Sequence, residues 1–132
     1  MSTPSEAVWL IQQLGDTPWL RMVYDYSHYA FRDMSVAETI ETALPYTAHI
    51  AIKDTIHADQ GFQFVLPGAS NSFDYADLFK RFYAGGYRAD ICCEVSGMVS
   101  SQAGYDPIAA AKTCYANIAP QFEQADVPRR SR

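Results

Sequence analysis

The stretch SVAETIETALPYTAHIAIKD, residues 35–54, contains a helix signal followed directly by a strand signal. Ser35 and Glu38 have the spacing of a capping box, in which each side chain bonds the backbone N–H at the other position, so a helix should begin right after the serine. Pro45 helps to end that helix. The short run AHIAIKD, residues 48–54, is typical of a strand in a parallel sheet.

The same order of helix and strand recurs on both sides of this stretch. Upstream, the sequence predicts a helix over residues 5–14 and an apolar strand over 19–25, which we expect to be buried on both faces. Downstream, it predicts a helix over 73–85, a strand over 89–95 and a last helix over 104–122. Strands that alternate with helices in this way indicate serial βα units around a parallel sheet, an α/β fold.

The length of 132 residues limits how this sheet can be completed. A closed (β/α)8 barrel typically takes about 250 residues, so the chain forms either a small open α/β sheet or part of a barrel. We expect residues 55–72 to be a long polar loop, residues 1–126 to form the folded unit and residues 127–132 to be a disordered basic tail. An open sheet has two unpaired edges, so we also expect self-association through them.

Composition and charge exclude several classes of protein. A formal net charge of -5, with only 10 Lys and Arg, argues against binding nucleic acid through a basic surface. There is no apolar run long enough to cross a membrane and no secretion signal, which favours a cytoplasmic protein without a membrane partner. Cys92, Cys93 and Cys114 match no zinc spacing and are expected to be reduced, buried thiols. No G-x-G-x-x-G follows a strand, so dinucleotide binding is not expected.

Polar and ionisable residues gather where the predicted strands end. In parallel α/β sheets and barrels, chemistry collects at the carboxyl ends of the strands. Three successive strand ends that each carry an acid therefore indicate a site. The residues are Asp25 and His28 after the first strand, His49, Lys53 and Asp54 on the second, and Glu94 on the third.

Each of these residues also has a purely structural interpretation. Asp25 alone could cap the following turn, and His28 could be an ordinary loop histidine. Lys53 and Asp54 could be a solvated strand end. Glu94 is harder to explain in this way, because a carboxylate inside an apolar strand is costly to bury unless it is paired or bound to a metal.

Four segments resemble the sugar phosphate isomerase/epimerase family, the xylose-isomerase-like TIM barrels. YDYSH (24–28) resembles the D-x-x-H of that family's sixth strand, and AHIAIKD (48–54) resembles the H-x-H-x-K-D of the seventh. Residues 66–87 resemble the glycine-containing loop and the helix that follow, and ICCEVS (91–96) resembles the closing strand with its glutamate. The resemblance covers nearly the whole chain as the carboxyl-terminal portion of a barrel. It implies a partial (β/α)8 TIM barrel with about three parallel strands alternating with four helices.

The resemblance also implies a chemistry. In that family a divalent ion (Mn, Mg, Co or Zn) is held by two glutamates, an aspartate and a histidine; carried over, Asp25 and Glu94 would be metal ligands. The ion would polarise the oxygens of a ketose and stabilise an enediolate. Glu94 would move the proton and His28 would hydrogen-bond a hydroxyl or carbonyl, which makes these two the expected catalytic residues. The expected substrate-binding residues are His28, His49, Lys53 and Asp54.

Two features depart from the family pattern. The second histidine of H-x-H is replaced by Ala51. His49 is on the same face of the strand but two residues farther from its carboxyl end. The cation of Lys53 would repel a metal. The strand that would supply the first glutamate is absent from the sequence, so we expect a part of a longer barrel, a truncated reading frame or a remnant.

Two functions remain open. The first is a sugar, sugar phosphate or polyol isomerase or epimerase that is active within a complete barrel and acts on a small-molecule substrate. The second is a non-catalytic sugar-binding or remnant domain of the same fold that uses no metal. An endonuclease-IV-like DNA repair function would need more metal ligands and a basic face, which the net charge argues against.

Overall fold

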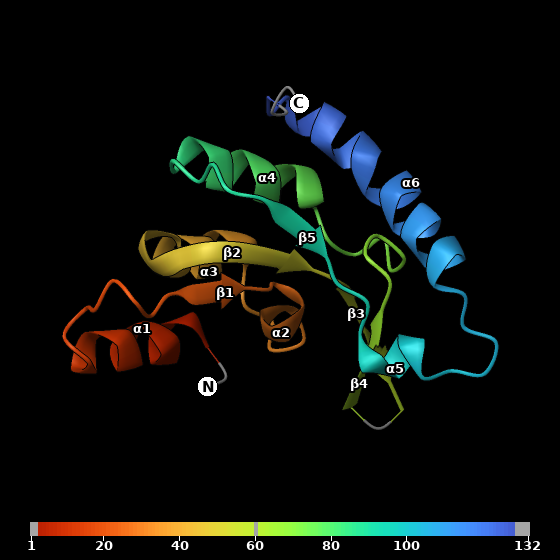
Figure 1. Ribbon diagram of the computed structural model, residues 1–132, viewed down its shortest axis with the longest axis horizontal. Helices are drawn as coiled ribbons and strands as arrows, with labels where there is room; N and C mark the ends of the chain where they lie inside the picture. The colour runs from red at the N-terminus through yellow and green to blue at the C-terminus, as the bar shows by residue number, and fades with distance from the viewer. Residues whose placement is uncertain (1–2, 60, 129–132) are drawn as a thin grey trace.

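A three-stranded parallel sheet organises the chain, in a computed structural model that describes residues 3–59 and 61–128. Its strands are β1 (Met22–Tyr24), β2 (Thr47–Ile52) and β5 (Ile91–Cys93), and β2 lies between the other two (Figure 1). Both strand pairs are parallel, as the sequence predicts for a partial (β/α)8 barrel.

Four longer helices alternate with these strands, which confirms the predicted order. A side chain at the N-cap of each helix accepts a hydrogen bond from a backbone N–H of the first turn, which satisfies donors that the helix leaves open. The helices are α1 (Pro4–Gln13), α3 (Val36–Ala43), α4 (Tyr75–Ala84) and α6 (Pro107–Ala125).

The hydrophobic core lies on one face of the sheet. The side chains of Tyr24 and Ile50 are fully buried there, against residues of α3 and α4 such as Ile40 and Phe82. Helix α6 packs on α4, where the rings of Phe79 and Phe122 stack with centroids 3.9 Å apart. This packing fixes the sheet, and with it the positions at which the strands end.

The opposite face of the sheet is open at Val23 and His49, so the prediction that the first strand is buried on both faces is wrong. Val23 is 59% exposed between two buried neighbours, and His49 is exposed on the adjacent strand. No layer of the described residues covers these side chains. Cys92 and Cys93 on β5 are also exposed, contrary to prediction, and Cys114 on α6 is buried as expected.

The predicted loop over residues 55–72 contains a hairpin that the sequence analysis missed. Strands β3 (Asp54–Ala58) and β4 (Gly61–Val65) pair antiparallel, and they lie beyond the end of β2 in Figure 1. Two short helices, α2 (Ser27–Ala30) and α5 (Gly97–Ser100), follow β1 and β5, and a 3-10 turn, η1 (Leu44–Tyr46), precedes β2. The hairpin, α2 and α5 thus all lie at the carboxyl end of the parallel sheet.

The end of the chain is described up to residue 128. Val127 packs against the core, and the part of the predicted disordered tail at residues 129–132 lies outside the described residues. None of the helices that the structure describes is long and apolar enough to cross a membrane.

Candidate functional site

The three parallel strands bring three charged side chains to one edge of the sheet. Asp25 directly follows β1, Lys53 directly follows β2 and Glu94 directly follows β5. The backbone N–H of Glu94 donates to the carbonyl of Ile52 at 2.9 Å, which continues the pairing of β5 with β2 up to the site. The strand ends that the sequence predicts therefore meet in space.

The ammonium of Lys53 joins the two carboxylates. Its Nζ donates to Asp25 Oδ2 at 2.6 Å and to Glu94 Oε1 at 2.7 Å. It also lies 4.8 Å from the centroid of the Phe64 ring, a cation–π distance. Short charge-assisted hydrogen bonds of this kind are the strong ones in proteins. We call Asp25, Lys53 and Glu94 the strand-end triad.

Burial differs sharply among the members of the strand-end triad. The side chains of Lys53 and Asp25 are 4% and 8% exposed, whereas that of Glu94 is 45% exposed. Burial by itself would lower the pKa of Lys53, but the hydrogen bonds and charges of the two carboxylates outweigh it and raise that pKa. The lysine is therefore a cation at neutral pH. Its burial shows that the interpretation of Lys53 as a solvated strand end is wrong.

The two carboxylate oxygens of Asp25 have different partners. Oδ1 accepts from the backbone N–H of Ser27 at 3.0 Å and from the Ser27 hydroxyl at 2.6 Å, which is the capping role. Oδ2 is the oxygen that faces Lys53. The turn thus fixes the orientation of the carboxylate before any ligand arrives.

His28 lies on α2, at the edge of the strand-end triad. Its Nε2 is 3.6 Å from Asp25 Oδ2, its side chain is 49% exposed, and its ring meets that of Phe64 edge-on. Burial lowers the pKa of His28, and the positive charge of Lys53 acts in the same direction, although Asp25 opposes it. The imidazole is therefore neutral at neutral pH, with one nitrogen that donates and one that accepts.

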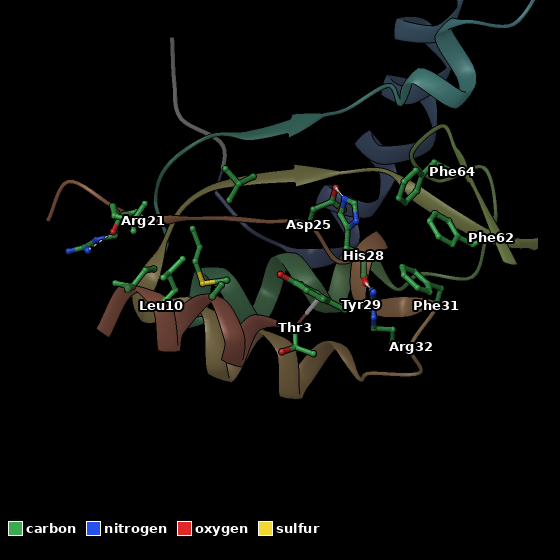
Figure 2. A pocket seen from close by; sticks show the side chains of 15 residues that line it. Thr3, Leu10, Arg21, Asp25, His28, Tyr29, Phe31, Arg32, Phe62 and Phe64 are labelled. Atoms are coloured by element: carbon green, nitrogen blue, oxygen red, sulfur yellow. Dashed lines mark hydrogen bonds and ion pairs between the residues drawn. The ribbon is translucent and has the colours of Figure 1, made fainter. Parts of the chain in front are cut away.

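A cavity of about 540 Å³ opens beside Asp25 and His28. Figure 2 shows these two side chains next to each other, with the rings of Phe31, Phe62 and Phe64 along the wall beyond them. The Phe31 and Phe62 rings stack with centroids 4.4 Å apart. The cavity therefore joins an apolar wall to a polar end, the usual character of a small-molecule site.

Two of the predicted site residues lie away from this cluster. Asp54 is fully buried on the helix side of the sheet, where it accepts from the backbone N–H and the hydroxyl of Ser70 and from the hydroxyl of Tyr75. His49 lies on the open face, paired in register with Val23. Among the described residues, no hydrogen bond or ion pair links His49 to the strand-end triad.

The sequence analysis did not single out two residues that shape the site. Ser27 fixes Asp25, and Phe64 covers Lys53 and contacts His28. The alternation of apolar Phe62 and Phe64 around polar Gln63 is a strand signal that could have placed Phe64 on a defined face.

The donor set at the strand ends does not fit a divalent ion. The two expected ligands, Asp25 and Glu94, converge on an ammonium, and the position of the family's histidine is the buried Ala51. Among the residues that the structure describes, there is no group of three or more His, Cys, Asp or Glu side chains that could hold a metal. Divalent ions need several oxygen, nitrogen or sulfur donors, and an ammonium offers none.

Comparison with known families agrees with the fold. The family model described as xylose isomerase-like TIM barrel matches residues 1–116. A search of curated proteins gave no match.

Proposed function

This chain belongs to the xylose isomerase-like TIM barrel family, and we propose from that premise that its strand-end site carries out isomerisation or epimerisation of a sugar, a sugar phosphate or a polyol-derived ketone. The observation that carries the proposal is the meeting of Asp25, Lys53 and Glu94 at the carboxyl ends of adjacent parallel strands. In TIM barrels the active site lies at that end.

Glu94 is the proposed base. Its carboxylate is 45% exposed, and in the described part of the chain its Oε2 accepts no hydrogen bond. It would take the proton from the carbon next to the ketose carbonyl, while the electron pair of the C–H bond forms the C=C bond of an enediolate and the carbonyl oxygen takes the negative charge. Return of the proton to the other face, or to the neighbouring carbon, gives the epimer or the isomer.

The other polar groups would orient the substrate and shape the local charge. His28, neutral and half exposed at the end of the cavity, would hydrogen-bond a hydroxyl or the carbonyl oxygen of the sugar. Lys53 contacts both carboxylates, and its positive charge favours negative charge that develops nearby. We propose that the site works within a complete barrel, because the open sheet face leaves one side of it uncovered.

Proton exchange in heavy water tests this proposal. The complete barrel that contains this chain is incubated in D2O with a panel of ketoses and ketose phosphates, and loss of the proton next to the carbonyl is followed by NMR. We expect exchange by the parent and a loss of about 10²-fold or more in Glu94→Gln, the usual contribution of a general base. Glu41→Gln is the matched control, because Glu41 is an exposed carboxylate on α3 that is not part of the strand-end triad. Exchange at the parent rate in Glu94→Gln would refute the role of Glu94.

A non-catalytic sugar-binding or remnant domain is the second candidate. Ala51 favours it, because it stands in place of a histidine ligand of the family's metal site, and the pairing of Lys53 with the carboxylates is compatible with a site that uses no metal. In the same experiment this function predicts sugar-dependent shifts of the His28 resonances without any proton exchange.

A further inference from the structure

The strand-end triad holds a cation of its own where the family resemblance places an ion. Lys53 Nζ lies within 2.7 Å of an oxygen of each carboxylate that the resemblance assigns to metal binding. A single ammonium thus occupies the point toward which Asp25 and Glu94 direct their oxygens.

The surroundings hold this ammonium in a buried position. The Lys53 side chain is only 4% exposed, and the Phe64 ring lies over its nitrogen. Asp25 is held from its other side by Ser27, so its carboxylate is not free to turn to a different partner. Moving Lys53 away would leave a buried aspartate without its cation, which is strongly unfavourable.

A divalent ion and this ammonium compete for the same oxygens. An ion bound to Asp25 Oδ2 would lie close to Lys53 Nζ, and like charges a few ångströms apart in a buried site repel strongly. The family motif H-x-H-x-K-D carries this lysine together with a second histidine, but here Ala51 stands at that histidine's position, so the ligand that would hold an ion beside the lysine is missing. The repulsion between the two cations and the small number of ligands therefore both favour the Lys53 ammonium over a divalent ion.

We propose that the Lys53 ammonium permanently takes the place of the family's divalent ion, so that this site binds no divalent cation and is organised by an internal lysine. Lys53 acts as a positioning residue that holds the Glu94 carboxylate at the mouth of the site and neutralises Asp25. The inference deepens the proposed function, but it rests on the geometry of the strand-end triad. It is tested by metal binding and not by turnover. A failure of this inference can therefore be distinguished from a failure of the proposed catalytic function.

Removal of the lysine should create the metal site that the parent lacks. In Lys53→Ala the carboxylates of Asp25 and Glu94 face a vacated position, and His28 Nε2 lies 3.6 Å from the same Asp25 oxygen. Two carboxylates and an imidazole form a donor set that suits Mn²⁺ or Zn²⁺. In this chain, which lacks the second histidine of the family motif, the side chain of Lys53 therefore decides whether the ion can bind.

The experiment titrates Mn²⁺ alone into the parent chain, Lys53→Ala and Lys53→Ala/Asp25→Asn, and follows free Mn²⁺ by electron paramagnetic resonance. We expect no saturable binding by the parent, one Mn²⁺ per chain in Lys53→Ala at least tenfold more tightly than in the parent, and loss of that binding in the double variant. Lys53→Gln, which keeps a neutral side chain of similar length, replaces the alanine variant if that one does not fold.

Two results would overturn the proposal. One is stoichiometric Mn²⁺ binding by the parent that Asp25→Asn abolishes, because the ion then displaces the lysine. The other is a folded, lysine-free chain that still binds no Mn²⁺, because the lysine is then not what keeps the ion out.

Discussion

Lys53 contacts two carboxylates whose exposure is very different, and this difference predicts unequal effects of mutation. Asp25 is buried with it, whereas Glu94 is 45% exposed. Removing Lys53 leaves the buried negative charge of Asp25 without its cation, which usually lowers the free energy of unfolding by about 3–5 kcal/mol. Removing the charge of Glu94 breaks an ion pair that water already screens, for which about 1 kcal/mol or less is typical.

We therefore expect the free energy of unfolding to fall far more in Lys53→Met than in Glu94→Gln, as measured by urea denaturation. Adding Asp25→Asn to Lys53→Met should restore part of the loss, since the stranded charge is gone. Lys80→Met, at an exposed position on α4, is the control and should change little. Equal losses in Lys53→Met and Lys80→Met would mean that the strand-end triad does not form.

The buried pair of Asp54 and Tyr75 predicts a loss of stability at high pH. Burial raises the pKa of Tyr75 above its usual value near 10, and the adjacent Asp54 raises it further. The unfolded chain therefore loses the phenol proton first. The stabilisation is complete below about pH 10 and declines above it, by up to about 1.4 kcal/mol per pH unit, until the higher pKa of the folded state is reached.

Urea denaturation between neutral pH and about pH 11 measures this decline. Tyr75→Phe should make it shallower, while Tyr115→Phe, at an exposed position on α6, should leave it unchanged. The same slope in the parent and in Tyr75→Phe would contradict the assignment.

The sequence predicts which residues reach the strand ends better than it predicts what they touch there. The positions of Asp25, Lys53 and Glu94 follow from strand boundaries and parallel pairing. The bridging of two acids by Lys53 does not follow, because it depends on a long side chain that has several possible partners. Asp54 shows a second limit, because the sequence analysis placed it in the site. Successive side chains of a strand point to opposite faces, so the side chain of Asp54, next to Lys53, points into the helix layer.

Among the elements, the regular helices and the parallel strands were predictable and the hairpin was not. Capping residues and apolar runs mark α1, α3, α4 and α6 directly. The pairing of β3 with β4 was not predicted, because the polar residues and Gly61 in this segment are typical of a loop. The hairpin supplies Phe64, so the element that the sequence did not reveal is also one that covers the site.

The loop between β4 and α4 predicts a position that is intolerant of a side chain. Gly68 has φ +75°, and a Cβ there would lie 2.5 Å from the Asn117 Cβ. Asn117 in turn donates to the carbonyl of Pro67 at 3.0 Å, which ties this loop to α6. Gly68→Ala should therefore suffer both the left-handed backbone penalty of about 1–2 kcal/mol and an overpacking penalty of about 1–3 kcal/mol.

Gly104→Ala separates these two penalties. Gly104 also has positive φ, but a Cβ there would meet nothing within 4 Å, so only the backbone penalty should appear. Thermal or urea unfolding of both variants measures the difference. A loss in Gly104→Ala as large as that in Gly68→Ala would mean that the contact with α6 is unimportant.

For the molecule as a whole, the open face of the sheet predicts association. Val23 is 59% exposed and Trp19 is 93% exposed near the free edge of β1. Exposed apolar side chains beside an unpaired strand edge favour pairing with another chain. Sedimentation velocity over a wide range of chain concentration should show growing oligomers, and Val23→Lys should suppress them. A parent chain that remains monomeric throughout would contradict this expectation.

The overall architecture was predictable because helix and strand signals alternate along the whole chain, and the family match over residues 1–116 agrees with it. What the alternation could not reveal is which face of each strand is covered. A run such as MVY in β1 looks equally apolar on both sides, yet only one side meets helices. Such information lies in the neighbouring layers and not in the strand itself.

The most direct test of the strand-end triad is the ¹H–¹⁵N NMR spectrum of the chain with ¹⁵N-labelled lysine at neutral pH. A buried ammonium that is bonded to two carboxylates exchanges its protons slowly, whereas Lys80 and Lys112 are exposed and exchange quickly. We predict a protected ammonium signal from Lys53 that persists in Glu41→Gln and disappears in Asp25→Asn. A spectrum in which Lys53 exchanges as quickly as Lys80 and Lys112 would contradict the bridging lysine, and with it the internal cation at the centre of the site.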